Sequence, residues 1–173
     1  MPPLFASTMK IVLATLGSLG DLHPFMAIAL RLKEHGYDVV LATSPDFRDN
    51  VTAEGIAFHP VGPGLEEVLR DLQMDAGELG RRVMKETMFI LEAGCFPYLK
   101  RMYEDLRPAI DGASLVMTST LMYSARFAAE KIGIPQMTVA LQPMVFLSAY
   151  DPPSVSPAPW VAPLMAKLGP AVT

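Results

Sequence analysis

Residues 9–24 read MKIVLATLGSLGDLHP and place a strand, a tight turn and a helix start in direct succession. A short apolar run ends at a turn that is bracketed by two glycines, Gly17 and Gly20. Asp21 follows this turn, and Pro24 suits the first turn of a helix. Because open α/β sheets bind ligands beyond the carboxyl ends of their strands, we expect Asp21 to lie where chemistry takes place.

Strand and helix patterns alternate along the rest of the chain. Apolar runs predict strands at residues 10–15, 38–43, 56–61, 115–118 and 135–141. Helical spacing, caps and glycine stops predict helices at 24–35, from Ser44-Pro45 to Gly55, at 121–131, and over 65–107 with breaks near Gly77, Gly94 and Pro97. This alternation predicts an α/β fold: a Rossmann-like, doubly wound parallel sheet with helices on both faces.

The length of 173 residues suits one ordinary domain. We expect a disordered leader at residues 1–8 and the folded domain at residues 9–150. Residues 151–173 hold six prolines and one helical turn near 161–168, so we expect a tail or lid there, with Trp160 as its anchor.

The composition argues against a nucleic-acid partner and predicts much buried apolar surface. The net charge of −4 gives no basic footprint, so we expect no nucleic acid. The apolar fraction is 51% and the charged fraction only 18%, against about 25% in typical domains. A buried parallel sheet is the main expected cause, and apolar surface that belongs to a missing domain is the second.

The expected location is the cytoplasm. The single cysteine, Cys95, excludes an internal disulfide and fits a reducing compartment. Residues 1–8 do not resemble a signal peptide. The longest apolar run, near 137–149, is interrupted by Gln142 and Pro143 and is too short to span a bilayer.

The glycine loop does not match the usual nucleotide signatures. It is neither G-x-G-x-x-G nor a Walker A loop, and Thr43-Ser44 stands where a dinucleotide-binding domain has an acid. A Rossmann-like oxidoreductase is therefore a weaker alternative. The loop amides, the helix start and the Ser18 hydroxyl suit an anionic group such as a phosphate.

Two interpretations of Asp21 follow from the spacing alone. Asp21 could accept a proton, or it could only interact favourably with the positive helix end while the glycines permit the turn. Pro24 as the first helical residue makes His23 the cap and leaves Asp21 free. His23 as the base is a further alternative.

Three runs carry a resemblance to a known family. GSLGDLHPFMAIALRLKEHGYDVVLATSPDFRDNV (17–51) and GIAFHPVG (55–62) resemble the N-terminal domain of GT-B glycosyltransferases of families 1 and 28. AAEKIGIPQMTVALQPMVFLSAYDPP (128–153) resembles the rhamnosyltransferases of rhamnolipid synthesis within that group.

This resemblance implies a function and roles for residues. In the family an N-terminal domain holds the acceptor, a C-terminal domain holds the nucleotide sugar, and the sugar is transferred with inversion and without a metal. Asp21 matches the general base, and Gly17, Ser18 and Gly20 match the loop that approaches the donor. A UDP- or dTDP-sugar is then a co-substrate, and no other cofactor is expected.

The sequence therefore predicts the acceptor-binding half of an inverting glycosyltransferase. It would move a hexose or deoxyhexose to a hydroxyl of an apolar acceptor, such as a lipid, sterol or polyketide. The donor domain is missing from these 173 residues, so the chain alone should bind acceptor without turnover. The alternative is a non-catalytic binding subunit that needs a separate donor-domain partner.

The expected acceptor pocket combines polar and apolar side chains. Its members are His23, Met88, Phe89, Ser119, Thr120 and Gln142. Methionine-rich walls adapt to flexible ligands, although core packing is the more common role of side chains such as Met88 and Phe89. The histidines lack metal-ligand spacing, so we expect no metal. Acidic and basic residues in this region balance, so the sequence does not require a membrane, and weak association with a membrane surface stays an alternative.

Overall fold

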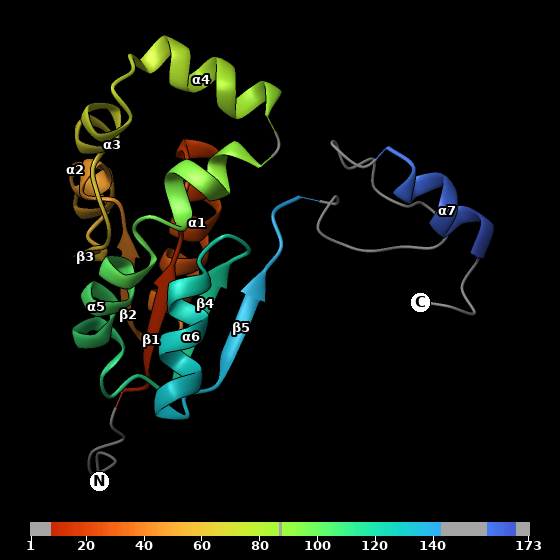
Figure 1. Cartoon of the computed structure of the whole chain (residues 1–173). Coiled ribbons are helices and arrows are strands. Elements are labelled where there is room, and N and C mark those ends of the chain that lie inside the picture. Colours follow the sequence, from red (N-terminus) through yellow and green to blue (C-terminus); the bar gives the residue numbers. More distant parts are fainter. Residues whose placement is uncertain (1–7, 87, 143–158, 169–173) are drawn as a thin grey trace, which may run out of the picture.

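The computed structural model describes residues 8–86, 88–142 and 159–168 (Figure 1). Among these residues, five strands form one parallel sheet, in the order β3-β2-β1-β4-β5. The strands are β1 Lys10–Ala14, β2 Asp38–Thr43, β3 Ala57–Pro60, β4 Leu115–Ser119 and β5 Gln136–Val139. The predicted doubly wound parallel sheet is confirmed, and no strand end differs from the predicted one by more than two residues.

The order of the strands reverses its direction at β1. The chain passes from β1 to β2 on one side, and after β3 it crosses back to β4 on the other side of β1. Ala14 of β1 pairs with Ala42 of β2 and with Thr118 of β4, so the three strands end at a similar level. Open α/β sheets bind ligands beyond the carboxyl ends of the strands at such a switch point.

Helices cover both faces, and each face has its own core. The covering helices are α1 Leu19–Glu34, α2 Arg48–Ala53, α5 Leu99–Ile110 and α6 Tyr123–Ile132. Phe25 of α1 packs in one core with Leu13 of β1. Leu106 of α5 and Ala125 of α6 pack in the other core with Val12 of β1. Successive residues of a strand point to opposite faces, so β1 contributes to both cores and reads as one apolar run.

Two turn signals of the sequence act as predicted. Ser44 caps the short 3₁₀ helix η1 Pro45–Phe47, because its Oγ accepts the N–H of Asp46 at 3.4 Å. Gly133 follows α6 with φ +74°, the left-handed conformation that glycine adopts readily. Both signals are local in the sequence, which is why pattern alone could find them.

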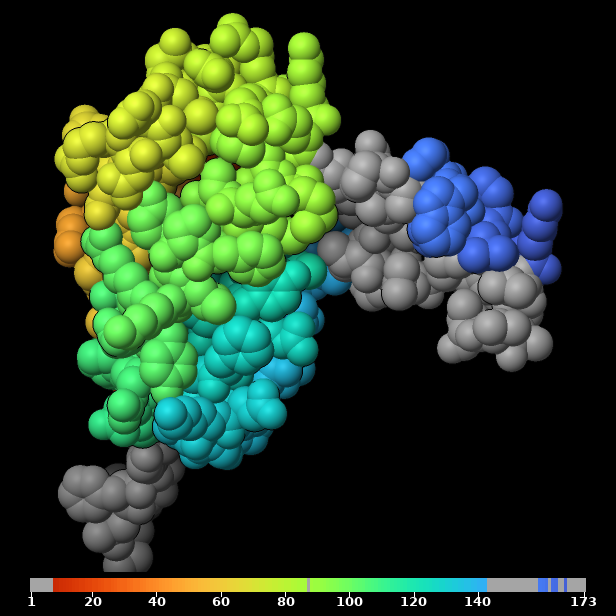
Figure 2. Space-filling model, in the orientation of Figure 1, coloured from red at the N-terminus to blue at the C-terminus, as the bar shows by residue number. Residues whose placement is uncertain are grey.

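A helical excursion joins β3 to α5 beyond the carboxyl ends of the strands. It comprises α3 Leu65–Leu72, α4 Ala76–Lys85 and the π-helical turn η2 Ile90–Cys95. α3 and α4 form the upper end of the molecule (Figure 2). The predicted break near Gly77 lies before that residue, because the carboxylate of Asp75 caps α4 by accepting the N–H of Glu78 at 2.8 Å. Gly94 lies inside η2, and the break at Pro97 is confirmed.

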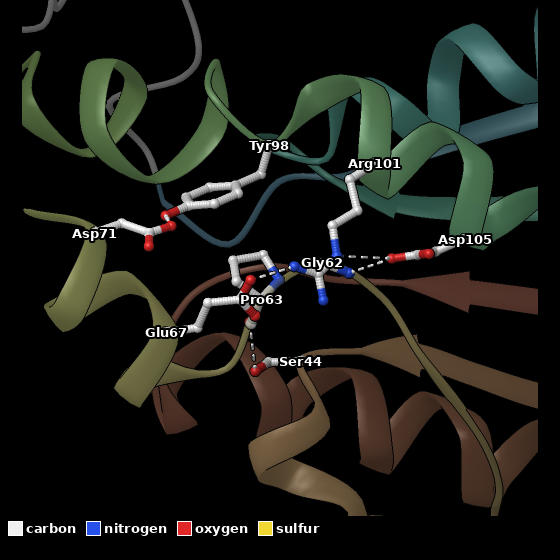
Figure 3. Close-up of polar contacts among 8 residues, drawn as sticks. All are labelled: Ser44, Gly62, Pro63, Glu67, Asp71, Tyr98, Arg101 and Asp105. Atoms are coloured by element: carbon white, nitrogen blue, oxygen red, sulfur yellow. Dashed lines mark hydrogen bonds and ion pairs between the residues drawn. The ribbon is translucent and has the colours of Figure 1, made fainter.

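A clasp of five polar side chains holds α3 and the preceding loop against α5 (Figure 3). Its members are Glu67, Asp71, Tyr98, Arg101 and Asp105. Arg101 pairs with Glu67 at 2.5 Å, and the Tyr98 hydroxyl donates to Asp71 at 2.7 Å. Asp105 accepts the N–H of Gly62 at 2.9 Å. The clasp therefore fixes the first helix of the excursion to the body of the domain.

The last described element is α7 Val161–Leu168, at the position of the predicted helical turn. Trp160 beside it is 64% exposed. The predicted leader, apart from Thr8, and most of the predicted tail lie outside the described residues. Within the part of the chain that the structure describes, none of the helices is long and apolar enough to cross a bilayer.

The Tyr98 phenol gives the clasp a dependence on alkaline pH. Burial first, and then the hydrogen bond to Asp71, raise the pKa of Tyr98 to about 12. A raised pKa means that the folded state favours the protonated phenol. The contribution of this phenol to the free energy of unfolding is therefore complete below its ordinary pKa of about 10 and is lost as pH rises through about 12. We expect Tyr98→Phe to flatten the decline of unfolding free energy between about pH 10 and 12, measured by urea titration, with Tyr123→Phe as the control. Equal declines in Tyr98→Phe and wild type would contradict the assignment.

Cys95 provides a probe of the core at the end of η2. It is 1% exposed, and burial raises the pKa of its thiol to about 11. Since the thiolate is the reactive form, we expect a disulfide reagent at pH 8 to label the folded chain about 100-fold more slowly than the urea-unfolded chain. Cys95 is the single cysteine, so the signal has one source. Similar labelling rates in both states would show that η2 opens freely.

Candidate active site at the carboxyl edge of the sheet

A small hollow of about 30 Å³ lies among the connections that follow β1, β4 and β5. Its lining residues are Leu16, Asp21, Ser119, Thr120, Leu121, Leu141 and Gln142. β1 and β4 are the two strands on either side of the switch point, so the hollow occupies the place where open α/β sheets bind ligands. It is the position at which a carboxylate, two hydroxyls and an amide converge.

A larger groove of about 430 Å³ lies along α1 near the start of β2. It is shallow and mostly apolar, and it includes Arg31, which pairs with Glu34 at the surface. We regard the smaller hollow as the candidate site because of its position and chemistry. A binding site needs convergent polar groups as well as volume.

Asp21 is held in a capping box at the start of α1. Ser18 is the N-cap, and its Oγ accepts the N–H of Gly20 at 3.2 Å. The carboxylate of Asp21 reaches back, and its Oδ2 accepts the N–H of Ser18 at 2.8 Å and the Ser18 hydroxyl at 3.2 Å. Both of these bonds use the same carboxylate oxygen, and Asp21 also lines the hollow.

The predicted helix start was therefore wrong. We expected Pro24 to open the helix, His23 to cap it and Asp21 to be free. The helix begins at Leu19, with Pro24 inside it, because the box between Ser18 and Asp21 satisfies the first amides earlier in the chain. His23 is exposed on the helix and does not line the hollow.

Gly17 is required by the position of the Asp21 carboxylate. Its φ is +134°, a conformation that other residues rarely adopt. A Cβ added at Gly17 would lie 2.2 Å from Oδ2 of Asp21. A Cβ at Gly20 would meet only Ser18 Oγ, at 3.4 Å. The two glycines of the loop therefore differ in how well they tolerate a side chain. Only at Gly17 would a Cβ take the space of the Asp21 carboxylate.

The structure brings together four of the predicted site residues. Asp21, Ser119, Thr120 and Gln142 all line the hollow. Ser119 is 3% exposed, and its Oγ accepts the N–H of Leu16 at 3.4 Å. This hydrogen bond joins the end of β4 to the loop after β1, and both of these segments line the hollow.

Two other predicted pocket residues lie in the excursion and do not line the hollow. Met88 is 42% exposed. Phe89 is 5% exposed and lies under the guanidinium of Arg82, which is 4.1 Å from the centroid of its ring. Phe89 thus packs as part of the core, as one of the two interpretations expects.

Two of the three polar side chains near the end of β2 have structural partners. Thr43 is buried, and its hydroxyl has no hydrogen-bond partner in the part of the chain that the structure describes. The Ser44 hydroxyl donates to the carbonyl of Pro63 at 3.3 Å (Figure 3). Asp46, the nearest carboxylate, accepts the N–H of Leu65 at 2.6 Å. These bonds hold the loop after β3. Across the described residues, no cluster of three histidine, cysteine or acidic side chains could hold a metal ion.

Sequence reasoning missed three residues of the hollow, Leu16, Leu121 and Leu141. Each follows the end of a strand, β1, β4 or β5, which is the signal that could have found them. Leucine side chains carry no reactive group, so residue type alone does not mark them as site residues. They place apolar surface beside the polar groups of the hollow.

The sheet order and the position of the hollow define a Rossmann-like α/β domain with its candidate site at the switch point. The model of the glycosyltransferase family 28 N-terminal domain matches residues 11–150. The chain belongs to this family of N-terminal domains.

Curated and solved relatives agree with this assignment. The vancomycin aglycone glucosyltransferase of Amycolatopsis orientalis is 31% identical over 148 residues, which are 84% of this chain and 34% of that protein. Sterol 3-beta-glucosyltransferase UGT80B1 of Arabidopsis thaliana is 29% identical over 137 residues, 73% of this chain and 21% of that protein. The glycosyltransferase SsfS6 of Streptomyces sp. SF2575 has a TM-score of 0.59 and 25% identity, over 76% of this chain and 39% of that structure. The chain thus spans about a third or less of the length of these curated relatives.

The geometry of the loop predicts unequal effects of alanine at its two glycines. We expect Gly17→Ala to lower the free energy of unfolding by about 2 kcal/mol or more, because the new methyl group displaces Asp21 and strains the backbone. Gly20→Ala lies in the first turn of α1 and should be neutral or slightly stabilising. Urea unfolding of the two variants measures both values. Equal stabilities would show that the capping box does not fix the loop.

Proposed function

We propose that this domain binds the acceptor alcohol of an inverting GT-B glycosyltransferase and that Asp21 is its general base. The observation that carries the proposal is the hollow that joins Asp21 to Ser119, Thr120 and Gln142 at the switch point. A base must lie within hydrogen-bond reach of the proton it takes. A hydroxyl placed in this hollow lies beside the Asp21 carboxylate.

The proposed reaction is a single displacement at the anomeric carbon. The acceptor oxygen forms a bond to that carbon from the face opposite the leaving group, which inverts the configuration. The bond from the anomeric carbon to the diphosphate oxygen breaks, and the nucleoside diphosphate leaves with the electron pair. Asp21 takes the hydroxyl proton as the bond forms and later releases it to water.

The capping box orients the base in this proposal. Ser18 donates twice to Oδ2 of Asp21, which restrains the carboxylate and leaves its other oxygen for the acceptor hydroxyl. Gly17, Ser18 and Gly20 stay the predicted loop that approaches the donor. The positive end of the 16-residue helix α1 then supplies the attraction for the donor's diphosphate.

The donor in this proposal is a UDP- or dTDP-sugar, and a hexose or deoxyhexose is transferred. A second domain of the kind that longer relatives carry would hold the nucleotide. Which sugar is used, rhamnose included, depends on that domain. The domain described here supplies the base and the acceptor site.

An apolar acceptor fits the surface around the hollow. Three leucines line it, and exposed apolar side chains of the excursion lie beyond the same end of the sheet, including Val83 at 40% and Met84 at 90% exposure. One relative is named for sterols, which are largely apolar frameworks, and another for a vancomycin aglycone. A hydroxyl carried on a lipid, sterol or polyketide framework is the substrate class that we propose.

The base assignment predicts the behaviour of Asp21→Asn. Asparagine keeps an oxygen that accepts the N–H of Ser18, so α1 and the melting temperature should be preserved. The amide is not basic, so we expect kcat for transfer from a nucleotide sugar to fall by roughly 100-fold or more. The assay uses the intact gene product, with unfolding measured in parallel.

His23→Ala provides the matched control, since His23 is close in sequence but exposed and outside the hollow. It should leave kcat within a few-fold of wild type. Unchanged turnover in Asp21→Asn would exclude Asp21 as the base. Acceptor binding without any transfer by wild type would favour the non-catalytic binding subunit instead.

A further inference from the structure

We infer that Leu16, Leu121 and Leu141 form a fixed apolar collar that determines which alcohols reach Asp21. The inference rests on the proposed function and concerns the selection of the acceptor. The three leucines follow the ends of β1, β4 and β5. Together with the polar residues they surround the hollow from three separate connections.

The Asp21 carboxylate and the three leucines line the same small hollow, of about 30 Å³. A hydroxyl that reaches Asp21 there brings the carbons beside it against the leucine side chains.

The collar is anchored in both cores of the domain. Leu16 packs against the core on the side of α5 and α6, and its N–H is bonded to Ser119. Leu141 packs against the core on the side of α1. Side chains that are packed in this way move little, so Leu16 and Leu141 select among acceptors and do not adapt to them.

The apolar collar distinguishes two kinds of alcohol. When the carbons beside the reacting hydroxyl carry only hydrogen, they bury apolar surface against the leucines. When those carbons carry further hydroxyls, as in a sugar, these groups lose water without gaining a hydrogen bond from leucine. The collar therefore favours an isolated hydroxyl on an aliphatic framework over a polyol.

The test measures acceptor preference in variants of the collar. The intact gene product is assayed with a nucleotide sugar and two acceptors, 3-hydroxydecanoate and methyl glucoside. We expect wild type to prefer the hydroxy acid, and Leu121→Ser and Leu141→Ser to reduce the ratio of kcat/KM values roughly tenfold. Leu65→Ser, at a 47% exposed leucine outside the hollow, should leave the ratio unchanged.

The outcomes separate the inference from the proposed function. Leu141→Met keeps the apolar surface and should restore the wild-type ratio, which guards against a general loss of folding. Parallel losses for both acceptors with an unchanged ratio would overturn the collar, as would a wild-type preference for methyl glucoside. If wild type transfers sugar to neither acceptor, the inference is wrong, whereas the proposed function is tested separately by Asp21→Asn.

Discussion

The hydrogen bonds between Ser18 and the Asp21 carboxylate are the constraint on which the rest of the candidate site depends. They start α1 at Leu19, fix the carboxylate beside the loop, and leave no room for a side chain at residue 17. A helix start, a backbone turn and the orientation of an acid are thus one arrangement. The apolar strand β1 carries this arrangement to the carboxyl edge of the sheet.

One carboxylate has both a structural and a proposed chemical role. An acid in the first turn is stabilising because it lies near the positive end of the helix. The same bonds that stabilise the turn hold the group in a single orientation, which a base needs. The conflict between a capping role and a catalytic role for Asp21 is therefore only apparent, since the two oxygens of the carboxylate can serve different partners.

The domain combines fixed and exposed parts around the hollow. Near Asp21, Leu16 and Leu141 are packed into the two cores, and Ser119 links two strand ends. Farther out, α4 has no buried residues, and the clasp fixes the excursion chiefly through α3. This arrangement suits a family in which the reaction is shared and the acceptors differ. Sequence change in the excursion can alter the outer surface without disturbing the carboxylate.

The sequence by itself determined the class of fold and the place of the site. Alternating strands and helices, the glycine turn before Asp21 and the Ser44-Pro45 cap are local signals with local physical causes. Strand-edge reasoning placed Asp21 at the carboxyl edge of the sheet. The predicted acceptor pocket named six residues, of which Ser119, Thr120 and Gln142 line the same hollow as Asp21. The roles given to these residues stay proposals.

Only the tertiary structure decided which residues line the hollow with Asp21 and where Met88 and Phe89 lie. The start of α1, by contrast, is set by a local signal that the prediction missed. Ser18 rather than His23 caps the helix, because Gly17 leaves space for the Asp21 carboxylate that completes the capping box. The collar joins residues far apart in the sequence, so no periodicity marks it. Phe89 is buried with the guanidinium of Arg82 over its ring, a contact that spacing along a broken helix does not encode. Hydrogen bonds between neighbours in the sequence can be predicted from the sequence, whereas contacts across the sheet form only when its strands come together.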